Sequence, residues 1–195
     1  MRYHKVISIG HACQPANYIR SLTKQQEAYF FDWLVTPTDS FMKLIEHGPE
    51  SLFYDRSQFV SIDEPGRKKA TVTHKALGVI FYHEFPIGPK ALNSFDAVAM
   101  KYRNLARRWH ELNTIRNKVL FIRHYAGKGD SLLIQGALRR VFPNVPFDLL
   151  SVNEDEANKV SWGLPGIINM CVNPTTTDWR GDVTGWTDIF KQAIL

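Results

Sequence analysis

The sequence has few cysteines: Cys13 and Cys171 are the only two among 195 residues, and they lie in different segments. Two cysteines are too few for a disulfide framework, so we expect reduced thiols in an intracellular, cytoplasmic protein. No stretch approaches the roughly 18 apolar residues that a membrane-spanning helix needs. The chain also shows no basic N-terminal stretch followed by an apolar segment and a small-residue cleavage site, so no secretion signal is predicted.

The sequence also lacks zinc-finger spacing, a homeodomain pattern and an aromatic ribonucleoprotein motif. The formal net charge of +5 favours partners that carry negative charge. The basic residues form three separate clusters, at residues 67–69, 107–108 and 139–140. Two of these clusters fall on predicted helices, where a solvated polar face is the usual explanation, so nucleic acid is not an expected partner. No pair of Cys or His residues has the spacing of zinc ligands, and no metal site is predicted.

Apolar segments alternate with helical patterns along most of the chain. Strands are expected at residues 5–9, 76–85, 118–123, 147–152 and 167–172. Helices are expected at residues 15–22, 41–47, 94–113, 131–141 and from residue 186 to the end, with a loop before the last helix from residue 175. This alternation predicts an α/β fold: a mostly parallel sheet of about five strands with helices on both faces. The length, without linker or repeat, favours a single domain over residues 1–195.

Residues 5–20, KVISIGHACQPANYIR, contain the most informative turn of the chain. Gly10 ends an apolar strand, and Pro15 suits the first turn of a helix, where its missing N–H needs no partner. Cys13 is thus predicted between a strand and a helix N-terminus, where ligands bind in open α/β sheets. The unpaired N–H groups and the positive end of the helix dipole favour a thiolate there. The alternative is a small core residue, because free cysteine is often buried.

Three more polar residues, His83, His124 and Asn153, lie at or just past the ends of predicted strands. The carboxyl ends of parallel strands share one edge, so we expect these side chains to converge with Cys13. A thiol, an imidazole and an amide or carboxylate are the components of nucleophilic acyl transfer. The residues alone leave open whether His83 or His124 acts as the base.

Further candidates could orient the base or stabilise an oxyanion. Gln14 and the N–H groups that follow Cys13 are candidates for the oxyanion site, and His11 lies in the same turn. Asp32 is a lone acid in the aromatic stretch AYFFDWLVTP, and a buried carboxylate needs hydrogen bonds or a cation. Asp32 is therefore either a site residue or the cap of a turn. Whether Asp32 or Asn153 orients the base stays open.

Several segments together resemble a known family. ISIGHACQPANYIR, AYFFDWLVTPTDSF, VIFYHEF, VLFIRHY and WRGDVTGWTDIF, in this order, resemble a bacterial family of unknown function described as papain-like cysteine peptidases. The Gly-x-x-Cys-Gln turn and the Phe-Asp-Trp block are the most specific parts. The resemblance implies a thiol nucleophile at Cys13 with His83 as its partner and Asp32 as a third site residue. It also implies an alternative fold, papain-like α+β, with the Cys on a long helix and the His on an antiparallel sheet.

Three hypotheses for the function follow. The first is a cysteine-dependent hydrolase or peptidase that acts on a peptide or an acylated small molecule without a cofactor, and it predicts a lowered pKa at Cys13. The second is an acyltransferase in surface-polysaccharide biosynthesis, moving an acyl group from coenzyme A to a glycan. The turn at residues 127–129 would then meet phosphate groups, and the Gly-x-x-Cys-Gln turn is similar to one in a capsule-biosynthesis acyltransferase family. The third is a non-enzymatic module that binds an anionic glycan or nucleotide.

Overall fold

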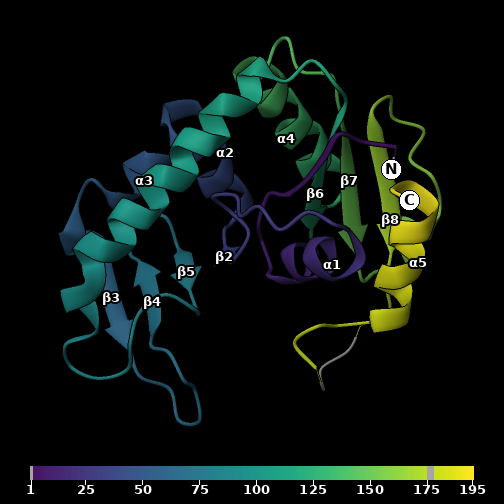
Figure 1. Ribbon diagram of the computed structural model, residues 1–195. Helices are drawn as coiled ribbons and strands as arrows, with labels where there is room; N and C mark the ends of the chain where they lie inside the picture. Colours follow the sequence, from purple (N-terminus) through teal and green to yellow (C-terminus); the bar gives the residue numbers. More distant parts are fainter. Residues whose placement is uncertain (1, 175–177) are drawn as a thin grey trace.

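The computed structural model describes residues 2–174 and 178–195, so residues 175–177 of the expected loop lie outside the described residues. The chain forms two four-stranded sheets (Figure 1). The parallel sheet has the order β1 (Lys5–Ser8), β6 (Val119–His124), β7 (Phe147–Asn153) and β8 (Ile167–Cys171). The antiparallel sheet has the order β2 (Leu34–Val35), β5 (Val79–Phe81), β4 (Thr71–His74) and β3 (Phe59–Ile62). The mixed α/β class and the parallel sheet confirm the expectation from the sequence.

The α-helices of the described residues are α1 (Gln14–Leu22), α2 (Thr38–His47), α3 (Phe95–Glu111), α4 (Lys128–Val141) and α5 (Val183–Ala193). Short 3-10 helices add η1 (Pro49–Phe53), η2 (Arg56–Gln58), η3 (Ala91–Ser94), η4 (Leu112–Thr114) and η5 (Glu156–Lys159). Pro15 lies in the first turn of α1, as expected, and Asp182 caps α5 by accepting a hydrogen bond from the Gly185 N–H. Across residues 2–174 and 178–195, no helix combines the length and the apolar character needed to cross a bilayer.

Alternate residues of the parallel strands enter two separate apolar clusters. In β6, Leu120 and Ile122 pack with residues of α1 and α5, where the rings of Tyr18 and Trp186 stack at 5.3 Å. Phe121 belongs to the other cluster, which includes residues of α3 and α4. Successive side chains of a strand point to opposite faces of the sheet. The continuous apolar sequence of β6 therefore reflects burial on both faces, which is typical of a parallel strand.

The expected strand at residues 76–85 does not join the parallel sheet, so the prediction of one sheet with about five strands is wrong. Within this range only β5 is a strand, and it pairs with β4 in the antiparallel direction. Only four residues separate β4 from β5, and Gly78 in this turn has a φ of +61°. Such a short connection joins antiparallel strands, because parallel neighbours need a crossover of a dozen or more residues. The papain-like alternative anticipated an antiparallel sheet here.

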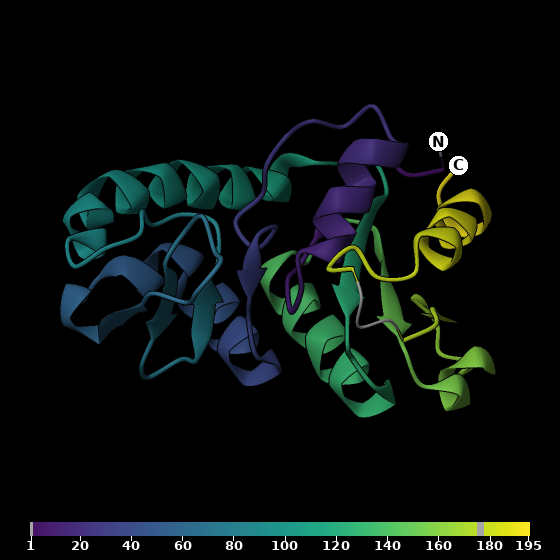
Figure 2. The same ribbon diagram turned by 90° about the horizontal axis from the view of Figure 1, so that it is seen from below.

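Helix α3 connects the two sheets, running from the antiparallel sheet towards the parallel sheet in both views (Figures 1 and 2). In its middle, Tyr102 contacts Phe81 of β5 at a ring distance of 5.7 Å. Near its end, Trp109 contacts Phe121 of β6 at 6.0 Å. All four side chains are at most 1% exposed. One aromatic cluster thus holds the two sheets in a fixed relation.

We expect Trp109→Ala to lower the free energy of unfolding by about 3–5 kcal/mol, since a large buried side chain is replaced by a cavity. Met100→Ala is the matched control on the same helix, because Met100 is 62% exposed. The control should change stability by less than about 0.5 kcal/mol. Denaturant unfolding followed by tryptophan fluorescence and circular dichroism measures both; equal effects of the two substitutions would contradict the role of Trp109.

Candidate active site

Cys13 lies in the turn between β1 and α1, at the carboxyl end of the parallel strand. Gly10 and His11 both have left-handed backbone angles, with φ of +80° and +63°, and Cys13 is the N-cap residue of α1. A Cβ atom at Gly10 would lie only 3.3 Å from Thr36 Oγ1 and 3.4 Å from Arg123 Nη1. The turn therefore requires glycine both for its backbone angle and for its close packing. The predicted position of Cys13, after a strand and before a helix, is confirmed.

His83 approaches Cys13 from the other sheet. It follows β5, two residues after the end of the strand, and its Nε2 lies 3.5 Å from the Cys13 Sγ. The two residues are 70 positions apart in the sequence. We expected them to meet at one edge of a single parallel sheet. That reasoning is wrong because His83 follows a strand of the antiparallel sheet. The side chains of Cys13 and His83 nevertheless lie next to each other, as expected.

A cavity of about 360 Å³ opens beside this pair. It is lined by Ala12, Cys13, Gln14, Val35, Arg67, Tyr82, His83 and Trp179. The lining thus comes from the turn before α1 and the start of that helix, from β2 and loops of the antiparallel sheet, and from the segment before α5. A concave, largely apolar site with a few polar groups is the usual form of a small-ligand or substrate site.

Burial controls the protonation of both members of the pair. Burial, and to a smaller extent the negative charge of Asp32, raises the pKa of the Cys13 thiol to about 11. Burial also lowers the pKa of the His83 imidazole below its ordinary value of 6.5, which the charges of Arg67 and Lys101 reinforce and that of Glu84 opposes. Desolvation thus shifts this pKa in the direction opposite to the one expected for a resting thiolate. At neutral pH the pair is a thiol beside a neutral imidazole that can accept its proton.

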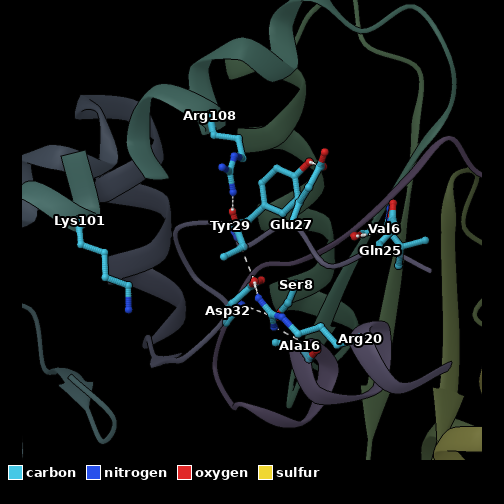
Figure 3. A network of polar contacts seen from close by, with 12 residues as sticks. Val6, Ser8, Ala16, Arg20, Gln25, Glu27, Tyr29, Asp32, Lys101 and Arg108 are labelled. Carbon is cyan, nitrogen blue, oxygen red and sulfur yellow. Dashed lines mark hydrogen bonds and ion pairs between the residues drawn. The ribbon is translucent and has the colours of Figure 1, made fainter. Parts of the chain in front are cut away.

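Asp32 is buried and paired with a cation, which is one of the two ways in which a buried carboxylate can be stabilised (Figure 3). Its Oδ2 accepts hydrogen bonds from Arg20 Nη2 at 2.8 Å and from the Tyr29 N–H at 2.9 Å. Burial raises the pKa of the Asp32 carboxyl to about 6, while Tyr29 and Arg20 lower it. None of its described hydrogen bonds reaches His83.

Arg20 and Trp33 link Asp32 to the Cys13–His83 pair. The Arg20 guanidinium lies over the ring of Trp33, 5.0 Å from its centre, and this ring meets the His83 ring edge-on at 5.5 Å. Arg20 belongs to α1, which begins directly after Cys13. The Asp32–Arg20 ion pair therefore connects the helix of the thiol to the aromatic ring that contacts the imidazole. Sequence reasoning missed Arg20 and Trp33, although a buried Asp32 called for a nearby cation.

Gln14 lines the cavity next to Cys13. Its Nε2 donates a hydrogen bond to the Trp179 carbonyl at 3.1 Å, and its Oε1 is buried without a hydrogen-bond partner among the described residues. Gly181 makes room for this side chain, since a Cβ there would lie 2.8 Å from Gln14 Nε2. Trp179 and Gly181 were not predicted as site residues. The signal that could have identified them is the WRGD segment, which is one of the segments that carry the family resemblance.

The structure does not bring His11, His124 and Asn153 into the cavity. His124 is fully buried, stacks on Tyr125 at 3.7 Å and has a pKa lowered by burial to about 3. Asn153 donates a hydrogen bond to the Ala126 carbonyl at 2.8 Å. Burial lowers the pKa of His11, whose ring lies 5.4 Å from that of Tyr125. His124 and Asn153 are the last residues of β6 and β7 in the parallel sheet, whereas His83 follows a strand of the antiparallel sheet.

Comparison with known proteins agrees with the resemblance seen in the sequence. A family model described as "putative papain-like cysteine peptidase" matches residues 4–145, and the chain belongs to this family. The matched range contains Cys13, Asp32 and His83 but ends before Trp179. Comparisons with curated proteins and with solved structures gave no match.

We expect Asp32→Asn to lower the pKa of the Cys13 thiol on the order of one unit, because it removes a negative charge that raises this pKa. The measurement is the midpoint of the pH profile for alkylation of Cys13 by iodoacetamide, followed by mass spectrometry. Asp39→Asn, at the exposed start of α2, is the control and should leave the midpoint unchanged. An unshifted midpoint in Asp32→Asn would show that its charge does not reach the thiol.

Proposed function

We propose that this member of the family is a cysteine-dependent hydrolase that cleaves a peptide or another acyl compound. Cys13 is the nucleophile and His83 is the general base. The observation that carries the proposal is the 3.5 Å approach of Cys13 Sγ and His83 Nε2 at the cavity, made by residues from two different sheets. A nucleophile within reach of a base, beside a pocket, is the common arrangement for covalent catalysis.

The first half of the reaction forms an acyl-enzyme. His83 Nε2 accepts the proton of the Cys13 thiol while Sγ attacks the substrate carbonyl carbon. The resulting tetrahedral intermediate collapses when the imidazolium donates this proton to the leaving amine. The bond from carbon to nitrogen breaks, and a thioester between Cys13 and the acyl group remains.

The second half uses the same groups with water. Neutral His83 takes a proton from a water molecule, which attacks the thioester carbonyl. The Cys13 sulfur leaves with the proton that His83 returns, and the acyl group is released as a carboxylic acid. Transfer to another acceptor would differ only in the group that attacks the thioester, so analysis of the products distinguishes hydrolysis from transfer.

Two features support stabilisation of the oxyanion and orientation of the base. The amide of Gln14 borders the cavity and has a second N–H besides the one that it donates to Trp179. The N–H groups at the start of α1 lie next to Cys13. Trp33, supported by Arg20 and Asp32, would position the His83 ring by packing rather than by a hydrogen bond to a carboxylate.

We expect Cys13→Ala to abolish hydrolysis and His83→Ala to reduce kcat/KM by about 10²–10⁴-fold, the usual contribution of a general base. Cys171→Ala is the matched control and should retain activity, because Cys171 lies in β8 and does not line the cavity. The measurement is turnover of a pool of fluorogenic peptides, together with iodoacetamide labelling at pH 7. Full turnover by Cys13→Ser would contradict the role of Cys13 as nucleophile. Labelling of Cys13 that is unaffected by His83→Ala would contradict the proposal and favour a binding module.

The pH profile tests the neutral state of the pair. The reactive form needs a neutral His83, so kcat/KM should fall as the pH decreases through the pKa of His83, which burial places below 6.5. Alkylation of Cys13 should continue to rise above pH 9, because the pKa of its thiol is about 11. Alkylation that has already reached a plateau at pH 5 would instead demonstrate a resting thiolate.

A further inference from the structure

Arg67 places a positive charge at the edge of the cavity. It is the only Lys, Arg, Asp or Glu among the described residues that line this cavity. Ala12, Val35 and Tyr82 supply apolar surface around it. A cation beside an otherwise uncharged lining is the group there that attracts a negatively charged part of a ligand.

Contacts with two neighbours hold the Arg67 side chain in place. Its guanidinium lies over the Tyr82 ring, 4.2 Å from the ring centre, and Tyr82 directly precedes His83. Its Nε donates a hydrogen bond to Glu64 Oε2 at 2.6 Å. In the described structure the two terminal nitrogens make no hydrogen bond, so they are left as donors for a ligand. The planar guanidinium is well suited to a carboxylate, which it can bind through two parallel hydrogen bonds.

The pairing with Glu64 uses Nε and leaves the rest of the guanidinium available to a ligand. Both side chains are partly exposed, at 39% and 42%, and exposed ion pairs are weak. Glu64 does not line the cavity, whereas Arg67 does. Arg67 lines the same cavity as Cys13 and His83, and its charge contributes to the lowered pKa of His83.

We propose that Arg67 makes this site selective for substrates that carry a carboxylate next to the bond that is cleaved. The proposal rests on the proposed function and adds the substrate class to it. The carboxylate would come from an acidic side chain or from the free carboxyl end of a peptide. Both sources present the same group to the guanidinium, and peptide pairs distinguish them.

Two alkylating reagents test the selectivity without a known substrate. Iodoacetate and iodoacetamide carry the same leaving group and differ in one negative charge. We expect the ratio of their alkylation rates at Cys13, iodoacetate over iodoacetamide, to fall by about tenfold in Arg67→Gln, since a charge-assisted contact is lost. Arg67→Lys should retain part of the ratio. Lys68→Gln is the matched control: Lys68 is exposed, neighbours Arg67 and does not line the cavity.

The outcomes separate the inference from the proposed function. A ratio that is the same in wild type and Arg67→Gln, or that falls equally in Lys68→Gln, overturns the role of Arg67, even if labelling still depends on His83. Labelling that is independent of His83 contradicts the proposed function, and the ratio still reports on Arg67. Fluorogenic peptides with Glu or Gln beside the cleaved bond, and with a free or amidated carboxyl end, then identify the source. Faster cleavage of both neutral peptides by the wild-type protein would also overturn the inference.

Discussion

The fixed relation between the two sheets is the constraint on which the candidate site depends. Cys13 follows a strand of the parallel sheet, and His83 follows a strand of the antiparallel sheet, so neither sheet alone contains the pair. Helix α3 and its buried aromatic residues connect the two sheets. Protein interiors are close-packed and resist small displacements. The 3.5 Å separation of thiol and imidazole is therefore a property of the whole core rather than of a local motif.

Desolvation favours the neutral forms of the candidate site residues, and an ion pair opposes this effect at Asp32. Burial disfavours the charges of Cys13, His83 and Asp32, and it shifts each pKa towards the neutral form. The Arg20 guanidinium partly offsets the cost of burying Asp32, and it also stacks on Trp33. The ion pair thus contributes to the geometry of the site, while the attraction between its charges is opposed by the cost of removing them from water.

The sequence predicted local features well and distant ones poorly. The turn that carries Cys13, the start of α1 and the strands of the parallel sheet follow from apolar runs, Gly10 and Pro15, which act over a few residues. The segment around β5 was misassigned because its apolar run has the composition of a buried parallel strand, and only its pairing with β4 distinguishes the two. Trp33 and Arg67 escaped prediction because their roles come from contacts with residues distant in the sequence. The raised pKa of Cys13 depends on burial, which a motif does not specify.

The neutral resting state of the Cys13–His83 pair also affects how Cys13 reacts with oxidants. The thiolate attacks an oxygen of a peroxide, and the rate of sulfenic acid formation follows the thiolate fraction of a cysteine. With a thiol pKa of about 11, Cys13 is almost entirely protonated at neutral pH. The same burial that withholds the thiolate thus protects the nucleophile from oxidative damage between turnovers.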